Sequence, residues 1–148
     1  MIKKFEPFDQ YKECANIGLK VNADELEQVY DYAAQGMLKM MFNVLDIRDF
    51  EKIKISVQGA SKEELLINFL NEILKQINEQ EKVFSTVKIL SFDTVHLKAE
   101  LSGENYNRNK HVKKGTIKRV TFQNVEIKKM ALEVNGPLVW HTEIVFVT

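Results

Sequence analysis

Residues 61–78, SKEELLINFLNEILKQIN, carry the pattern from which the architecture of this chain can be predicted. The stretch begins with a capping-box pattern, in which Ser61 is followed three residues later by Glu64. The apolar residues that follow recur at three- and four-residue spacing. They are Leu65, Leu66, Phe69, Leu70, Ile73, Leu74 and Ile77. This stripe is wide, so we expect a helix over 61–78 that lies across a sheet.

A second amphipathic helix is expected earlier in the chain. Asp24 can cap its start, and the helix should end near Asn43. Its apolar positions recur at helical spacing and are Leu26, Val29, Ala33, Met37, Met40 and Met41. Methionines at this spacing are typical of a core rather than of a functional surface.

The rest of the chain predicts strands and turns. Strands are expected at 17–21 and 53–57, a hairpin from 83–90 and 94–101 over Ser91-Phe92-Asp93, a loop at 102–110 and a long strand at 116–127. Residues 128–134 continue that strand or pair back, and Asn135-Gly136 is a turn signal. The closing strand, 138–147, should place one set of side chains on a single face: Leu138, Trp140, Thr142, Ile144 and Phe146.

Helices early and strands late favour an α+β fold, with two main helices packed on a mostly antiparallel sheet. The length favours a single domain over residues 1–148. No apolar run approaches the roughly 20 residues of a membrane span, and the N-terminus lacks the apolar region of a signal peptide. One cysteine, Cys14, fits a reducing compartment, so a cytoplasmic location is expected.

The common catalytic signatures are absent, including phosphate-binding loops, the G-x-S-x-G elbow and H-E-x-x-H. One cysteine and three separated histidines do not supply a zinc site. Asp46 and Asp49 could contribute to a site for a hard cation, but a solvated turn is the commoner role of such a pair. Cys14 could act as a nucleophile only with a nearby base, and a lone cysteine is more often a small buried hydrophobe.

Charge is segregated in a chain that is neutral as a whole, with 21 basic and 21 acidic residues. Residues 108–119 contain six basic side chains and no acid: Arg108, Lys110, Lys113, Lys114, Lys118 and Arg119. Such a segment can bind RNA phosphate or an acidic protein surface, with Tyr106 and His111 available to stack. Alternatively, the charges protect an edge strand from aggregation.

Four sequence blocks resemble one known family. Glu13-Cys-Ala-Asn-Ile-Gly18 stands where that family has His-Thr-Ala-Asp-Val/Ile-Gly. Residues 26–37 are similar to its first helix, with an Ala-Ala-x-Gly-Met run, and residues 65–74 to its second, Leu-Leu-x-x-Trp-Leu-Asn-Glu-Leu-Leu. Residues 111–128 are similar, without gaps, to the family's His-x-x-Lys-x-x-Val-Lys-Ala-Val-Thr-Tyr-His-x-x-x-Ile segment. In this order and spacing, the chain resembles the archease family over almost its full length.

The resemblance implies a small, non-enzymatic protein that assists the tRNA-splicing RNA ligase by promoting its guanylylation and multiple turnovers. Archeases are also described as chaperone-like modulators of tRNA-modifying enzymes. The resemblance further implies a divalent metal, calcium in known cases, held by the Asp of the N-terminal motif and an Asp close to the C-terminus.

Four positions depart from the family pattern. Asn16 stands for the motif Asp, Glu13 for the motif His, Gln123 for the His after Val-Thr-Tyr, and Val147 for the C-terminal Asp. Calcium affinity follows the number of charged ligands, so we expect no metal and no cofactor. Glu13 and the α-carboxylate of Thr148 are the groups that could partly replace the missing charge.

The leading hypothesis is therefore an accessory protein or chaperone-like modulator of an RNA ligase in tRNA splicing or RNA repair, without catalytic residues and with a degenerate calcium site. It expects a protein partner, indirect or weak RNA contact, and no membrane. Five residues are expected to bind the partner: His111, Lys113, Lys114, Lys118 and Arg119. The alternative is a metal-free protein-binding module on the same fold with a role unrelated to RNA ligation. An enzyme that uses Cys14 is a third, less favoured possibility.

Overall fold

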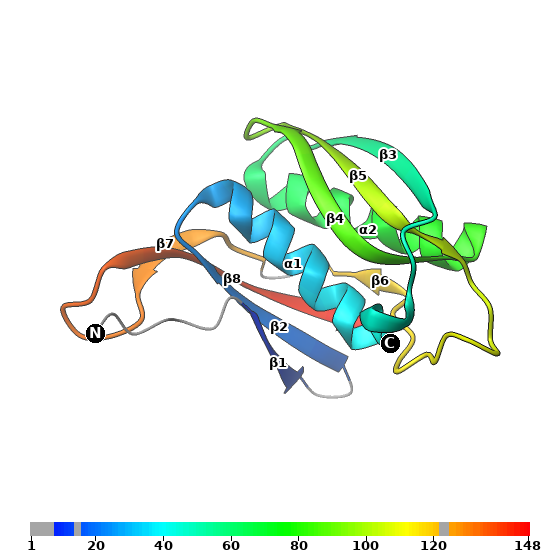
Figure 1. The fold of residues 1–148 in the computed structure, drawn as a ribbon. Coiled ribbons are helices and arrows are strands. Elements are labelled where there is room, and N and C mark those ends of the chain that lie inside the picture. Colours follow the sequence, from blue (N-terminus) through cyan, green and yellow to red (C-terminus); the bar gives the residue numbers. More distant parts are fainter. Residues whose placement is uncertain (1–7, 14–15, 122–124) are drawn as a thin grey trace.

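Two helices lie between two antiparallel sheets in the computed structural model, which describes residues 8–13, 16–121 and 125–148 (Figure 1). One sheet has the order β1-β2-β8-β6, with β7 also paired to β8, and the other has the order β3-β5-β4. The elements are β1 (Phe8–Glu13), β2 (Asn16–Ala23), α1 (Leu26–Met41), the 3-10 helix η1 (Val44–Asp46), β3 (Glu51–Gln58), α2 (Lys62–Gln80), β4 (Lys82–Phe92), β5 (His96–Asn105), β6 (Arg119–Val120), β7 (Lys128–Ala131) and β8 (Leu138–Val147).

The helix α2 begins where the capping pattern predicted. Ser61 is its N-cap, and the Ser61 hydroxyl accepts a hydrogen bond from the Glu64 backbone N–H at 3.1 Å. The helix ends at Gln80, two residues later than expected, and Glu81 closes it in the left-handed conformation. Every residue of the predicted stripe is buried, and Ile67, outside that stripe, is buried as well.

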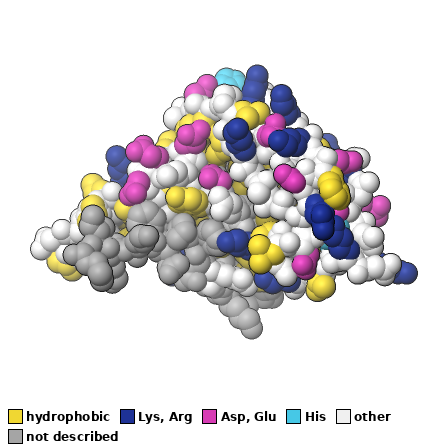
Figure 2. All heavy atoms as spheres, in the orientation of Figure 1, with side chains coloured by type: hydrophobic (Ala, Val, Ile, Leu, Met, Phe, Trp, Pro, Cys, Tyr) yellow, Lys and Arg dark blue, Asp and Glu magenta, His cyan; other side chains and the backbone are white. Residues whose placement is uncertain are grey.

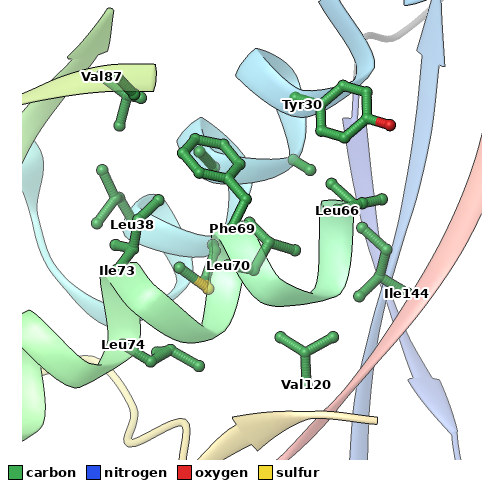
Figure 3. Close-up of a cluster of buried hydrophobic side chains, with 14 of the residues drawn as sticks. Tyr30, Leu38, Leu66, Phe69, Leu70, Ile73, Leu74, Val87, Val120 and Ile144 are labelled. Carbon is green, nitrogen blue, oxygen red and sulfur yellow. The ribbon is translucent and has the colours of Figure 1, made fainter. Parts of the chain in front are cut away.

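The burial of α2 on more than one side follows from its place between the sheets. Side chains of α2 meet those of α1 and of strands from both sheets (Figure 3). The labelled members of this core are Tyr30, Leu38, Leu66, Phe69, Leu70, Ile73, Leu74, Val87, Val120 and Ile144. The prediction of an α+β fold, with two main helices packed on antiparallel strands, is confirmed, and the strands form two sheets. The strands β3, β4 and β5 pair only with one another among the described residues, and they cover the opposite side of the helices.

The helix α1 forms at the predicted place with a different cap. Its N-cap is Glu25, not Asp24, and the Glu25 backbone N–H donates to Gln28 Oε1 at 3.0 Å. Met37 and Met41 are buried, which confirms the core interpretation of the methionine group. Within the described ranges, neither α1 nor α2 is both long and apolar enough to cross a membrane.

The predicted long strand over 116–127 was wrong. Among the described residues of this segment only β6 forms a strand with β8, and the flanking N–H groups of Lys118 and Thr121 donate to the Val147 and Val145 carbonyls. Side chains of α2 bond other backbone groups of the segment. Asn78 Nδ2 donates to the Ile117 carbonyl at 3.1 Å, and the Val120 N–H donates to Asn71 Oδ1 at 2.9 Å. Farther along, the Ile127 N–H donates to Glu63 Oε2 at 3.0 Å.

The strand β1 was not expected, whereas β2, β3, β4 and β5 agree with the predicted strands to within a few residues. The β4–β5 hairpin turns around Asp93, whose carboxylate accepts from the N–H groups of Val95 and His96. The strand β5 continues to Asn105, so the predicted loop at 102–110 starts later.

The strand β8 buries Thr142, Ile144 and Phe146 as expected, while Leu138 is 65% exposed. Leu138 lies beyond the β2–β8 ladder, which stops at Trp140, and at this end β8 pairs only with β7 among the described residues. The hydroxyl of Thr142 is buried and has no hydrogen-bond partner among the residues that the structure describes.

The strand β7 pairs back on β8 and forms a hairpin that projects from the body of the molecule (Figure 1). Asn135 has a φ of 61°, as the Asn-Gly turn signal predicted, and the Gly136 N–H donates to the Glu133 carbonyl at 3.0 Å. Val134 at the tip is 92% exposed.

Candidate functional site

Sheet pairing brings the N-terminal motif and the end of β8 to one edge of the molecule. Glu13 pairs with Asn16 in the β1–β2 ladder, and the next ladder runs from Ile17, which pairs with Phe146. Asn16 of β2 and Val147 of β8 are the next residues beyond this pair, so they lie at the same end of the two strands. On the other side of β8, Arg119 pairs with Val147, so one of the four departing family positions, Val147, adjoins the basic segment.

The described residues at this edge do not fit a calcium site. Asn16 offers one amide oxygen and Val147 offers no side-chain ligand, whereas calcium takes six to eight oxygens. No group of three or more His, Cys, Asp or Glu in the part of the chain that the structure describes could hold a metal. Asp46 and Asp49, both exposed, form no such group. Cys14, Gln123 and the Glu13 side chain lie outside the described residues, so the absence of a metal stays a prediction.

Glu104, at the end of β5, is the centre of a charged network. Its carboxylate accepts hydrogen bonds from the Arg48 backbone N–H at 2.7 Å and from Lys110 Nζ at 2.8 and 2.9 Å. These donors stabilise the ionised form, the Arg48 N–H most and Lys110 next, and they lower the pKa of Glu104 to about 2. The network ties the segment before β3 to the loop after β5.

His111 completes this network from the inside. Its Nδ1 accepts a hydrogen bond from the Asn107 backbone N–H at 2.9 Å, and its Nε2 lies 3.1 Å from Glu104 Oε2. Since a backbone N–H can only donate, the ring proton is on Nε2 and is donated to the carboxylate. His111 is only 2% exposed, so the expectation that its ring is available to stack was wrong. The two hydrogen bonds of the His111 ring instead hold the loop after β5 in place.

Two of the predicted partner-binding lysines also have structural contacts. Lys114 Nζ donates to the Lys39 carbonyl at 2.9 Å, and the Lys114 N–H donates to the Met41 carbonyl at 2.7 Å. These contacts place a cation at the C-terminus of α1, where the helix dipole favours positive charge. Lys113 Nζ lies 4.6 Å from the centre of the Tyr106 ring, a cation–π contact that covers part of that ring. Both lysines remain exposed.

The other three cations of the segment are exposed without partners. Within the described ranges, the side chains of Arg108, Lys118 and Arg119 make no hydrogen bond or ion pair. The hypothesis that these charges protect an edge strand is not needed at β6. Asn71 and Asn78 of α2 already occupy the backbone groups at Val120 and Ile117 that face away from β8.

A groove of about 650 Å³ opens beside the Glu104 network, between the start of β3 and the loop after β5. Phe50 stands in its wall with 71% of its surface exposed. The Arg48 guanidinium lies 5.9 Å and the Lys110 ammonium 5.8 Å from the centre of its ring. Figure 2 shows basic and exposed hydrophobic side chains gathered at this end of the molecule.

Sequence reasoning missed Glu104, Arg48 and Phe50. Glu104 stands in a stretch that is loop-like by composition, and its donors lie 56 and 6 residues away in sequence. No local periodicity encodes such a network. Phe50 gave a weak signal, since it is an aromatic residue between charged ones just before a strand.

Comparisons with known proteins agree with the geometry. The model of the Archease protein family (MTH1598/TM1083) matches residues 8–146. Protein archease of Thermococcus kodakarensis is 30% identical over 126 residues, which cover 83% of this chain and 89% of that protein. Protein archease of Pyrococcus abyssi is 29% identical with the same coverage. The solution structure of Methanobacterium thermoautotrophicum protein 1598 shares the fold, with a TM-score of 0.72 and 24% identity over 96% of this chain and 99% of that one.

Proposed function

Because the chain belongs to the archease protein family, we propose that it is a non-catalytic accessory protein of an RNA ligase that acts in tRNA splicing or RNA repair. It binds the ligase and promotes guanylylation and repeated turnover. The family match over residues 8–146 carries the proposal. In this role the protein supplies a binding surface and no reacting group of its own.

The arrangement of charge supports this role. Arg119 lies on β6 opposite Val147, and Lys118 directly precedes that strand; the side chains of both have no partner among the described residues. Unpaired cations at one edge favour fast association with an acidic or phosphate-bearing surface. Since Asn71 and Asn78 already block the edge of β6, these charges are free for a partner.

Ligase turnover tests the proposal. Purified ligase from the same organism is assayed for guanylylation and multiple-turnover RNA joining, with and without this protein. We expect stimulation by the wild type and a clear loss with the double variant Lys118→Ala, Arg119→Ala. The double variant Lys54→Ala, Lys98→Ala removes the same charge from exposed positions of the second sheet and should stimulate like wild type. Unchanged ligase turnover with the wild-type protein would refute the proposed function.

The metal-free part of the proposal has its own test. Asn16 and Val147 replace two carboxylates of the family site, so stimulation should not require calcium at this protein. Calorimetric titration with calcium should give no binding in the micromolar range, and EDTA should leave the thermal melt unchanged. Micromolar binding would contradict this part and would direct attention to Glu13 and Thr148.

A second candidate function is a protein-binding module on the archease fold with a role unrelated to RNA ligation. The neutral residues Asn16 and Val147 favour it, because they remove two charges of the family's metal site. Affinity capture from the native organism separates the two functions. Recovery of the ligase supports the first, whereas reproducible recovery of another protein without the ligase supports the second.

A further inference from the structure

The outer face of the sheet β3-β5-β4 carries positive charge that the proposed function does not use. Alternate side chains of these strands point away from the helices, and the strand register sets them side by side. Lys54 of β3 and Lys88 of β4 pair from either side with Glu100 of the central strand β5. Lys98 stands two residues before Glu100 on β5, and Lys52 stands two residues before Lys54 on β3. We call these five side chains the lysine face. Basic side chains gather over this sheet at the top of Figure 2.

The lysine face remains positive after the neighbouring carboxylates are included. Its four lysines and one glutamate give a net charge of +3, or +2 together with Asp93 of the adjoining β4–β5 turn. At the opposite end of the sheet, two carboxylates are each bonded to a further lysine: Glu51 to Lys82 and Glu104 to Lys110. Because the chain as a whole is neutral, this charge is a local property of one face.

Three of the four lysines are unpaired. Lys54, Lys88 and Lys98 are exposed, and within the described ranges their side chains make no hydrogen bond or ion pair. The single carboxylate of the face is shared with the fourth lysine, since Glu100 Oε1 lies 3.9 Å from Lys52 Nζ. Like charges on neighbouring strands of one face repel each other, and a bound polyanion removes that repulsion.

Protection of sheet edges does not account for this pattern. Lysines on edge strands discourage pairing with another chain, and β3 and β4 are the two outer strands of this sheet. Lys98, however, is on β5, which is paired on both sides. The ladder of β4 is also interrupted by two shifts in register, which themselves protect an edge. A lysine on the middle strand therefore indicates a ligand that lies over the sheet and not beside it.

The side chains around the lysines favour phosphate over a protein surface. Ser56 and Ser91 pair with Lys98 from either side, and Thr86 stands two residues before Lys88. These three exposed hydroxyls can donate to phosphate oxygens or to a ribose 2′-hydroxyl. The outward rows from Lys52 to Ser56 hold no apolar side chain, whereas the centre of a protein interface is typically apolar or aromatic and poor in lysine. The same rows lack Phe, Tyr and Trp, on which the bases of single-stranded RNA stack.

We propose that the lysine face binds the phosphate backbone of double-helical RNA. The choice of RNA over DNA rests on the proposed function, and the inference adds a second contact, separate from Lys118 and Arg119 of the other sheet. Strand geometry places Lys52 and Lys54 about 7 Å apart along β3, and Lys54 and Lys88 about 9.5 Å apart across the sheet. The lysines can therefore contact several phosphates at once. Recognition is by charge and shape, without reading of bases.

The test is the binding of a fluorescein-labelled RNA hairpin to the purified full chain, measured by fluorescence anisotropy without the ligase between about 50 and 200 mM salt. In the variant Lys88→Gln, Lys98→Gln the dissociation constant should rise about ten-fold at the lowest salt, and the slope of its logarithm against log salt should fall by about two. The variant Lys88→Arg, Lys98→Arg keeps the charge and should bind like wild type. The matched control Lys75→Gln, Lys128→Gln removes two exposed lysines elsewhere and should also bind like wild type.

Several results would overturn the RNA site. One is a wild type that does not bind the hairpin, and another is a wild type that binds a single strand of the same length more tightly. If Lys118→Ala, Arg119→Ala lowers the affinity for the hairpin and Lys88→Gln, Lys98→Gln does not, RNA binds at β6 instead. If poly-glutamate binds the wild type more tightly than the hairpin does, the occupant is an acidic protein.

The ligase assays separate this inference from the proposed function. Guanylylation joins no RNA, so the Lys88→Gln, Lys98→Gln variant should stimulate it like wild type, and turnover at saturating RNA should be stimulated equally. A wild type that binds the hairpin as expected but does not stimulate the ligase refutes the proposed function and leaves the RNA site standing. Stimulation of the ligase without any binding of the hairpin has the opposite meaning.

Discussion

The core around α2 and the network around Glu104 are stabilised by different interactions. The α2 core consists of apolar side chains packed between two sheets, and its strength depends little on pH or salt. The Glu104 network consists of a carboxylate with backbone, lysine and histidine donors at a part-exposed site. It joins the segment before β3 to the loop after β5, where Ile47 and Tyr106 lie at the border of the core.

The difference separates what keeps the chain folded from what shapes its surface. A core of this kind tolerates change poorly, because close-packed side chains leave cavities when truncated. A charged network is weaker and tunable, and it positions side chains such as Phe50 without burying them. The exposed cations Lys118 and Arg119 lie outside the α2 core, although Val120 of β6 is part of that core.

The largest expected effect is at the centre of the core. Phe69→Ala should lower the free energy of unfolding by about 3–5 kcal/mol, because Phe69 is fully buried between the helices and the sheets. Urea unfolding followed by circular dichroism measures it. Lys75→Ala, on the exposed side of the same helix, should change stability by less than about 0.5 kcal/mol. Equal effects of the two would mean that α2 is not the centre of the core.

The second-largest expected effect is in the charged network around Glu104. Glu104→Gln should cost about 1–3 kcal/mol at neutral pH, the usual range for hydrogen bonds to a charged group. The pKa of Glu104 is lowered from 4.5 to about 2 in the folded protein, so its stabilisation is fully present above pH 4.5 and is lost as the pH falls from 4.5 to 2. Unfolding curves from pH 7 to pH 2 for wild type and variant should therefore converge at the acidic end. A constant difference across this range would exclude an ionised Glu104 as the cause.

The third prediction concerns an unsatisfied polar group in the core, the hydroxyl of Thr142. Thr142→Val removes the buried hydroxyl that lacks a hydrogen-bond partner and keeps the shape of the side chain. Stability should rise by about 1 kcal/mol, since an unsatisfied buried hydroxyl costs about 1–3 kcal/mol. The melting temperatures of Thr142→Val and Thr142→Ser, each compared with that of the wild type, measure the change in stability. A lower melting temperature for the valine variant would show that the hydroxyl has a partner in solution.

The smallest effect is at the contact between the basic loop and α1. Lys114→Ala should lower stability by about 0.3–1 kcal/mol, because it removes the cation that donates to the Lys39 carbonyl at the end of the helix. The loss should shrink in 1 M salt, where screening weakens charge–dipole interactions. Lys114→Arg keeps the charge and serves as the control. A loss that salt leaves unchanged would point to packing of the lysine stem.

The helices could be predicted because their periodicity is local. The spacing from Leu65 to Ile77 and the Ser61 cap predict the start of α2 correctly. In the same way, Asn135-Gly136 marks the turn between β7 and β8. The second sheet could not be predicted, because strand alternation shows which residues face a core and not which strands pair. The strand expected at 116–127 was wrong, and the sequence could not show that its backbone divides its hydrogen bonds between β8 and side chains of α2, which are remote in sequence.

The candidate site was predictable only in part, for similar reasons. The basic composition of 108–119 was evident, whereas the partners of individual lysines were not: Lys113 contacts Tyr106 and Lys114 contacts the end of α1. The burial of His111 depends on Glu104, which no motif marks. The adjacency of Asn16 and Val147 follows from β2–β8 pairing and could be inferred from the family resemblance alone.

The polar side chains of α2 that bond the segment after the basic loop determine how that segment unfolds locally. The backbone amides of Val120 and Ile127 are bonded to side chains of α2, Asn71 and Glu63, rather than to a neighbouring strand. Their protection from hydrogen exchange therefore depends on the integrity of the helix, and these amides should exchange together with α2 in one cooperative unit. In terms of local unfolding, this part of the chain belongs to the helix that it crosses and not to the sheet whose edge it forms.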